Sequence, residues 1–328
     1  MEPVTHVLAS VALAKAGVGR GMRGAVPMLL ASGLAADLDW LAYFGGPRAF
    51  VWLYRTWSHS LLWTVAIAAA VAGVYLFMRK SAGHQRPRFL PVFLVCLAGA
   101  GLHLLLDLGN PYGVKLLWPF SGKWVAWDLL TFVDPGLLFL LVAGLLLPAL
   151  FRLVTEEIGV KARRSGRGAA VALVLVALYL GGRWMLHERA HAQLMARMYH
   201  GAIPLTAAAY PQAASPFNWN GVVATENTIE EVTVPLGPGS QFDPDRSRTH
   251  FKPEATPQLE AALESEMAKR FVAYARFPLA SVERIEEGWR VTLRDVRFAN
   301  GSAGVGVELE IDVDKQAQVI GDRWTWGN

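Results

Sequence analysis

Cysteine and acidic residues are both scarce in the first part of this 328-residue sequence. The single cysteine, Cys96, excludes an internal disulfide, and the lack of other thiols argues against a structural zinc site. Residues 1–186 contain 8 acidic and 17 basic residues, whereas residues 187–328 contain 19 acidic and 14 basic residues. The net charge of +4 therefore hides two unlike parts, and it does not predict a nucleic-acid partner.

Long apolar runs replace the missing polar residues in the first part. They fall at roughly 4–14, 25–44, 61–78, 89–108, 129–151 and 169–186. A spanning helix needs about 20 residues, so the last five runs can span a membrane and the first is too short. The N-terminus lacks the basic region of a signal peptide. The sequence predicts an α-helical membrane bundle over residues 1–186, with about five spans plus a short N-terminal helix.

Basic residues are concentrated in every second loop of this bundle. The loops near residues 15–23, 79–88 and 152–167 are rich in lysine and arginine, whereas loops 45–58 and 109–128 carry few. Basic loops stay in the cytoplasm. We therefore expect a multi-pass membrane protein whose residues 187–328 are extracytoplasmic.

The acidic C-terminal part has the pattern of a soluble domain. Residues 187–203 continue the last helix as a juxtamembrane helix, and a proline-rich stretch follows. Apolar and polar residues alternate over residues 288–298 and 305–314, which predicts two strands. Residues 257–273 are predicted to form an amphipathic helix with Thr256 as its N-cap. Residues 204–328 are thus predicted to form a small α+β domain.

Ionisable residues inside the apolar runs are the strongest functional signal. Each costs about 2.5–3.5 kcal/mol at membrane depth, so such residues are usually paired or bound to a cation. His103 and Asp107 are four residues apart and share one helix face. The predicted topology brings most of the others towards the external side. The candidate residues are His6, Asp37, Asp39, His59, His103, Asp107, Asp128 and Asp134.

Imidazole nitrogen and carboxylate oxygen are the ligands of zinc, manganese and iron sites. We expect a divalent metal, with zinc preferred and manganese as the alternative. Simpler explanations exist for single residues. Asp39 or Asp128 could cap a helix, and Asp107 could pair with Lys115 or Lys123.

Taken in order, several of these motifs resemble the YdjM-type family of inner-membrane metal-dependent hydrolases. They are His6, the DLD of residues 37–39, RTWSHS (55–60), and HLLLD (103–107) with GNPYGVKLLWPFS after it. The later segments DLLTFVDP (128–135), YPQAASPFNWNGVVATE (210–226) and RFVAYARFP (270–278) resemble the YfhP-like branch. The resemblance covers nearly the whole chain, and it implies a location in the bacterial inner membrane.

The resemblance implies a metal site at His6, Asp37, Asp39, His59, His103 and Asp107. Asp128, which lies beside an apolar run, is a further candidate ligand. One departure stands out. Where the family usually has a histidine five residues before His59, this chain has Tyr54. The site is also distantly similar to zinc-dependent phospholipase C, which suggests phosphoester chemistry.

The leading functional hypothesis is a membrane-bound metal-dependent hydrolase that acts on a lipid or lipid-linked phosphoester among the membrane lipids. A carboxylate not used by the metal, Asp39 or Asp134, would be the general base. One alternative is a non-enzymatic membrane protein with a structural polar cluster and an external interaction domain of unknown partner. A third is a cation transporter.

Overall fold

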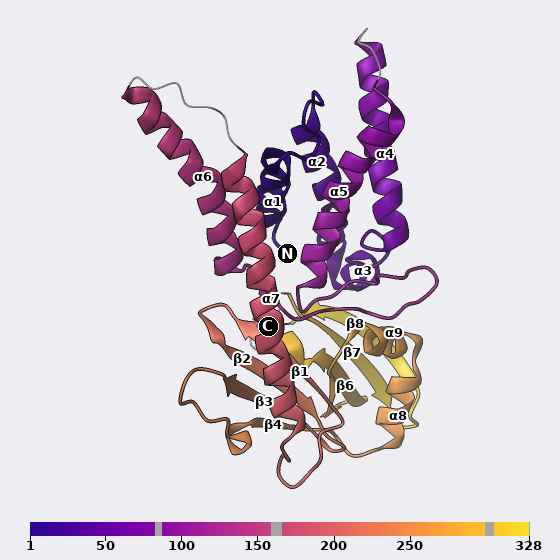
Figure 1. Ribbon diagram of the computed structural model, residues 1–328. Coiled ribbons are helices and arrows are strands. Elements are labelled where there is room, and N and C mark those ends of the chain that lie inside the picture. The colour runs from indigo at the N-terminus through magenta and orange to yellow at the C-terminus, as the bar shows by residue number, and fades with distance from the viewer. Residues whose placement is uncertain (83–86, 159–165, 299–304, 328) are drawn as a thin grey trace. The chain divides into compact units, whose positions relative to one another are not determined.

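A computed structural model describes residues 1–82, 87–158, 166–298 and 305–327. The chain forms two compact units (Figure 1). We call the first the membrane unit; it comprises Met1–Asp39 and Arg55–Arg183. We call the second the sheet unit; it comprises Trp40–Tyr54 and Trp184–Asn328.

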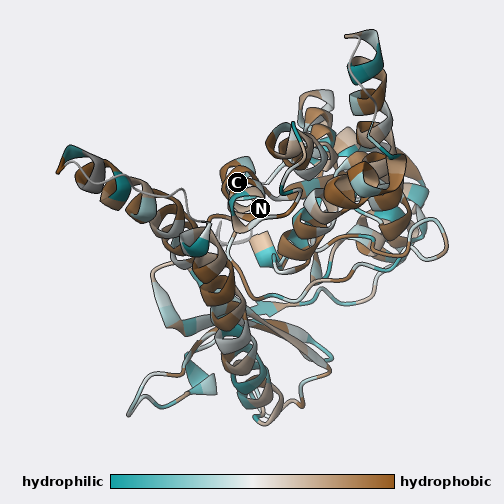
Figure 2. Ribbon diagram, turned by 45° about the horizontal axis from the view of Figure 1, so that its top comes forward, coloured by the Kyte–Doolittle hydropathy of each residue, from teal (hydrophilic) through white to brown (hydrophobic). Residues whose placement is uncertain are grey.

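Long apolar helices dominate the membrane unit, as the sequence predicts. Its helices are α1 (Pro3–Ala16), α2 (Ala25–Leu34), α4 (Leu61–Ser81), α5 (Phe89–Leu108), α6 (Pro135–Glu157) and the first part of α7 (Arg167–Met195). Five described helical segments are long and apolar enough to span a membrane: Ala25–Leu53, Leu61–Ser81, Phe89–Leu108, Pro135–Val154 and Arg167–Met195. Figure 2 shows hydrophobic residues along most of their length. The prediction of about five spans plus a short N-terminal helix is confirmed.

Local sequence signals define how the helices that carry the candidate residues begin and pack. Pro3 occupies the first turn of α1 and Glu2 caps it, so His6 lies one turn inside the helix. Ser60 caps α4 by accepting a hydrogen bond from the Trp63 amide at 3.3 Å. At Gly99 of α5, a Cβ atom would come within 2.8 Å of the Leu29 carbonyl oxygen of α2. Glycine therefore permits the close contact between these two helices.

The second apolar run is not one straight helix. After α2 the chain continues as a 3₁₀ helix, η1 (Ala36–Gly45), and then as α3 (Gly46–Leu53). Residues 40–54 pack within the sheet unit, where the Tyr43 ring stacks on Trp326 at 4.5 Å and Phe50 meets the same indole at 5.4 Å. The run that we predicted over residues 25–44 therefore divides between the two units.

Two four-stranded antiparallel sheets, each in sequential order, form the body of the sheet unit. Helices α8 and α9 precede the second sheet, so the predicted small α+β domain is confirmed. The elements are β1 (Thr206–Gln212), β2 (Ser215–Ala224), β3 (Thr228–Pro235), η2 (Pro244–Arg246), β4 (Arg248–Phe251), α8 (Pro257–Glu264), α9 (Glu266–Tyr274), β5 (Pro278–Ile285), β6 (Gly288–Asp295), η3 (Val296–Phe298), β7 (Val307–Asp314) and β8 (Val319–Trp326).

The first sheet packs against a core on each face, and β1 is buried along most of its length. One face packs on the end of α7, where Leu194 contacts a core containing Trp219, and the other face packs on a core containing Phe277 and Val296. Strands buried on both sides lack the simple alternation that a half-exposed strand shows. This explains why the proline-rich stretch, which contains parts of β1 and β2, gave no strand signal.

The other local predictions for this unit can be compared directly with the structure. Alternation over residues 288–298 and 305–314 predicted β6 and β7, but residues 296–298 form η3 instead of continuing β6. Thr256 is the N-cap of α8, and its hydroxyl accepts from the Leu259 amide at 3.2 Å. The predicted helix 257–273 is interrupted at Ser265, whose side chain caps α9 by accepting from the Ala268 amide. Serine competes for backbone hydrogen bonds and so favours a new helix start there.

Candidate metal centre

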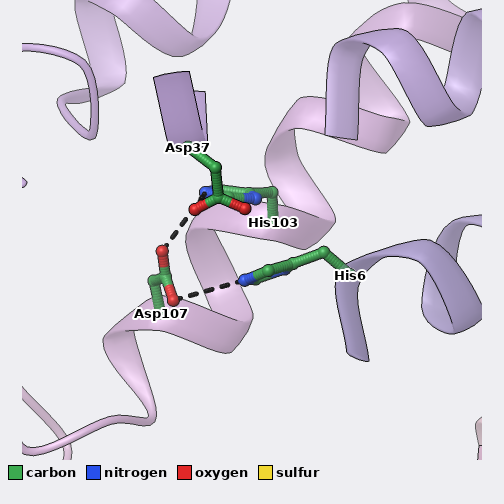
Figure 3. A group of neighbouring side chains, drawn as sticks. All are labelled: His6, Asp37, His103 and Asp107. Carbon is green, nitrogen blue, oxygen red and sulfur yellow. Dashed lines mark ion pairs between the residues drawn. The ribbon is translucent and has the colours of Figure 1, made fainter. Parts of the chain in front are cut away.

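Four of the candidate residues come together in the membrane unit. Each of His6, Asp37, His103 and Asp107 offers one ligand atom, and these atoms all lie within 4.8 Å of one another (Figure 3). Helix α5 supplies His103 and Asp107, α1 supplies His6, and η1 supplies Asp37. The imidazoles of His6 and His103 stack with their centroids 4.0 Å apart. This buried His/Asp group could hold a metal ion.

Asp107 lies at the centre of the group and is fully buried. Its Oδ2 lies 3.2 Å from His103 Nε2 and 2.9 Å from Nε2 of His59, which belongs to the loop before α4. Oδ2 has no hydrogen-bond partner among the described residues, so the two contacts are close but lack the geometry of hydrogen bonds. His59 thus joins the four clustered residues, and Oδ2 faces two imidazole nitrogens without a proton aligned between them.

The partners of the Nδ1 atoms of His59 and His103, which point away from Asp107, determine the tautomer of each ring. His103 Nδ1 lies 2.7 Å from the Gly33 carbonyl oxygen, which can only accept. His59 Nδ1 lies 3.0 Å from Asp39 Oδ2, a carboxylate oxygen that also accepts. Both Nδ1 atoms therefore carry the proton in the neutral rings, and both Nε2 atoms present lone pairs.

These two lone pairs face each other, because His59 Nε2 and His103 Nε2 are only 3.0 Å apart. Such an arrangement is unfavourable unless a cation lies between the nitrogens or a proton bridges them. Metal-binding histidines typically donate their outer N–H to a carboxylate or a carbonyl, which is the pattern found here. The donor set thus fits a divalent cation, and an imidazolium at His59 is the competing explanation.

His6 and Asp37 contribute further unsatisfied atoms. His6 is 1% exposed, and neither of its ring nitrogens has a hydrogen-bond partner within the described parts of the chain. Its Nε2 lies 3.5 Å from Asp107 Oδ1. Asp37 Oδ1 lies 3.8 Å from His103 Nε2, and Asp37 Oδ2 is buried with no described hydrogen-bond partner. Buried polar atoms without partners are costly, and a bound cation would satisfy several of them together.

Asp39 supports His59 rather than joining the clustered ligand atoms. Its Oδ2 accepts from the Arg55 amide at 2.8 Å and from the Ser58 hydroxyl at 2.5 Å, besides its contact with His59. Its Oδ1 has no described hydrogen-bond partner. The carboxylate therefore orients the imidazole through Oδ2 and keeps one oxygen for other chemistry.

Arg55 is a site residue that the sequence did not reveal. In the sequence it is one of the few basic residues of loop 45–58, but its side chain is 1% exposed and its Nη2 lies 2.7 Å from Asp107 Oδ1. The Met1 amino group also contacts this oxygen. Arg55 has a left-handed backbone with a φ of 54°, a strained conformation that is common at functional sites. Asp107 therefore pairs with Arg55, and not with Lys115 or Lys123 as the simpler explanation proposed.

The structure does not bring Asp128 and Asp134 into this group. Asp128 is buried in a left-handed conformation with a φ of 56°, and it does not cap a helix as we considered. The capping residue is Asp134, whose Oδ1 accepts from the Leu137 amide at 3.0 Å and from the Tyr179 hydroxyl at 2.8 Å. Its Oδ2 lies 3.5 Å from Arg183 Nη2. Asp134 thus joins α6 to α7, and its role as a general base stays a prediction without geometric support.

Tyr54, which replaces the histidine usual in the family, packs among aromatic rings. It stacks on Phe50 at 4.4 Å and meets Trp40 edge-on at 5.7 Å, all within the sheet unit. The structure therefore gives Tyr54 a packing role. The group that could hold a metal ion consists of His6, Asp37, His103 and Asp107, and His59 contacts it through Asp107.

Comparisons with known proteins agree with this architecture. Residues 1–190 match the family model described as YdjM inner membrane protein. The chain is also 30% identical over 147 residues to the uncharacterized protein YfhP of Bacillus subtilis (strain 168). That similarity covers 41% of this chain and 42% of the relative, so the chain matches less than half of the relative's length. No solved structure matches the chain significantly. Because the family model covers more than half of its residues, this chain belongs to the YdjM inner membrane protein family.

Proposed function

We propose that this chain is a membrane-bound, metal-dependent hydrolase. The facing Nε2 lone pairs of His59 and His103, 3.0 Å apart beside Asp107 Oδ2, are the observation that supports this proposal most directly. In the proposal His59, His103 and Asp107 hold the cation, with His6 and Asp37 completing the set. Nitrogen and carboxylate ligands without thiolates favour zinc, with manganese as the alternative.

The chain's own residues have distinct roles in this hypothesis. A bound divalent cation would supply Lewis-acid chemistry for hydrolysis. Arg55 holds Asp107 Oδ1, which leaves Oδ2 directed at the two imidazoles. Asp39 orients His59 through Oδ2, and its Oδ1 makes it our candidate general base.

The proposed substrate is a lipid or a lipid-linked phosphoester. Two features support it: His103 and Asp107 lie on α5, an apolar helix long enough to span a membrane, and Arg55 provides a buried positive charge beside them. A substrate that enters from the lipid phase reaches such a site without crossing water. The distant similarity to phospholipase C suggests phosphoester chemistry, which a lipid phosphoester assay tests.

Metal analysis of the purified full-length protein tests the central claim. Wild type should retain zinc or manganese in near-stoichiometric amounts by mass spectrometry. The variants His59→Ala, His103→Ala and Asp107→Asn should each lose it. The matched control is His200→Ala, which changes a histidine that is 54% exposed on its side chain in the sheet unit.

The outcomes separate the proposal from its rivals. If wild type retains no transition metal after reconstitution with zinc and manganese, a protonated structural cluster explains the site and the hydrolase proposal fails. If metal is retained, release of the headgroup or phosphate from lipid phosphoesters should depend on Asp107. Transport of the metal without any hydrolysis would favour the cation transporter instead.

The proposed orientation, with residues 187–328 outside the cytoplasm, has its own test. Cys96 is buried, so it gives little background in cysteine labelling. An impermeant thiol reagent added to intact cells should label Ala214→Cys in the exposed turn between β1 and β2, and it should not label Ser81→Cys at the end of α4. Labelling with the opposite pattern would put the sheet unit in the cytoplasm.

A further inference from the structure

A second feature of the membrane unit lies at the opposite end of α1 from the metal-site candidate. A cavity of about 590 Å³ is lined by the end of α1 and the loop after it, the start of α2, part of α6 and the start of α7. Lys15 on this cavity is nine residues after His6. At 1.5 Å per residue, about 13 Å of helix separates the two places. The cavity is therefore separate from the His/Asp group.

The walls of the cavity combine apolar and basic side chains. Small and aliphatic residues form most of the lining, among them Val26, Leu145 and Ala149. Three basic residues also line it, Lys15 and Arg20 from the first loop region and Arg152 from the end of α6. Among the described residues, no aspartate or glutamate lines the cavity. The result is a largely apolar recess whose lining also carries three positive charges.

This combination matches the chemistry of one class of membrane component. Basic pockets between membrane helices bind anionic lipid headgroups, and the apolar walls suit the adjoining acyl chains. A soluble anion would use the basic residues but gain nothing from the apolar lining. A zwitterionic lipid would use the lining but gain little from three positive charges.

We propose that this cavity binds an anionic phospholipid, with Lys15, Arg20 and Arg152 around the headgroup and the α6 wall against an acyl chain. The basic residues belong to the loops whose charge predicts a cytoplasmic position. The binding site is independent of the metal proposal, because it shares no residue with the His/Asp group.

Native mass spectrometry of the full-length protein in detergent tests this binding. Wild type should retain phosphatidylglycerol and bind phosphatidylcholine at least tenfold more weakly. The triple variant Lys15→Gln/Arg20→Gln/Arg152→Gln should lose at least about tenfold in phosphatidylglycerol binding, because each basic residue near an anionic lipid surface contributes about fivefold. The matched control is Arg79→Gln/Lys80→Gln at the end of α4, which should bind as wild type does.

A cavity-filling variant distinguishes a lipid from a free phosphate group. Ala149→Trp keeps all three basic residues and narrows the apolar wall, so it should weaken phosphatidylglycerol binding. Binding of free glycerol 3-phosphate, measured by equilibrium titration, should be weak in wild type and unchanged by Ala149→Trp. Equal retention of the two lipids by wild type, or wild-type retention of phosphatidylglycerol by the triple variant, would overturn the proposal. Glycerol phosphate binding as tight as lipid binding would overturn it as well.

Discussion

Two buried groups of charged residues, one in each unit, are paired in different ways. In the sheet unit, Asp295 and Arg297 are 4% and 5% exposed, and they form a complete pair. In the membrane unit, His6, His103 and Asp107 are equally buried, but many of their polar atoms face one another without hydrogen-bond geometry. Burial of charge alone therefore does not identify a functional site. Incomplete pairing of the buried groups is the more informative feature.

The pair in the sheet unit shows what a structural arrangement looks like. Arg297 donates from Nε to Asp295 Oδ2 at 2.8 Å, and its Nη2 lies 2.7 Å from the same oxygen. The amides of Arg276 and Arg297 donate to the two carboxylate oxygens at 2.8 and 3.0 Å. Burial lowers the pKa of Arg297, but the neighbouring Asp295 raises it above its usual range, so the guanidinium stays charged.

The largest predicted effect comes from breaking this complete pair. Asp295→Asn leaves the Arg297 charge buried without its counter-ion, which typically costs about 3–5 kcal/mol. Hydrogen exchange of the β6 and β7 amides in the full-length protein should then accelerate by more than about a hundredfold.

The matched change in the membrane unit should behave differently. His6→Leu replaces a buried side chain that has no described hydrogen-bond partner with an apolar one of similar size. In the metal-free protein, exchange of the α1 and α5 amides should change less than about tenfold. In protein reconstituted with metal, the same substitution should lower the amount of metal retained. If His6→Leu were as damaging as Asp295→Asn, the membrane cluster would be a structural pair like the other.

A smaller effect is expected where a residue supports a proposed ligand without binding the metal itself. Asp39→Asn removes the charged acceptor of His59 Nδ1–H, so metal affinity should fall about 10–100-fold, as for other outer partners of metal-binding histidines. Competition titration with a chelator measures the change. Ser58→Ala is the control, because it removes one donor to Asp39 and leaves the carboxylate in place. Complete loss of metal in Asp39→Asn would make Asp39 a ligand, and unchanged affinity would remove its orienting role.

The sequence predicted the features that depend on local spacing. Apolar run lengths predicted the spans, and the four-residue interval between His103 and Asp107 placed both on one face of α5. Alternation predicted β6 and β7 because each has one polar and one apolar face. These signals need no knowledge of distant contacts.

Features that depend on tertiary contacts could not be predicted from the sequence. Arg55 resembles any loop arginine in the sequence, and only the fold pairs it with Asp107, 52 residues away. Asp134 resembles the site aspartates, but it caps α6 and contacts Tyr179 and Arg183 of α7. Residues 40–54 belong to the sheet unit because they contact residues such as Trp326, which lies near the other end of the sequence.

The smallest predicted effect concerns a partly exposed ion pair of the sheet unit. Arg290 donates from Nε to Asp312 Oδ1 at 2.7 Å and from Nη2 to Oδ2 at 3.0 Å, and this hydrogen bonding lowers the pKa of Asp312. Both side chains are more than a quarter exposed, so solvent screens the pair and Arg290→Gln should cost at most about 1 kcal/mol.

The difference in stability between wild type and Arg290→Gln should depend on pH, and the direction of the Asp312 pKa shift gives the sign of that dependence. An aspartate whose pKa is lowered in the folded state contributes stability that is fully present above its unfolded pKa of about 3.9. That contribution disappears as the pH falls through the lower folded pKa, so the difference between wild type and Arg290→Gln should shrink below about pH 4. Amide exchange of β6 and β7, with each pH point corrected for its intrinsic rate, measures this difference. Arg294→Gln, an exposed change on the same strand, should show no such dependence. A difference that stayed constant to pH 2 would mean that Arg290 stabilises the sheet through its packing, since charge pairing with Asp312 requires the ionised carboxylate.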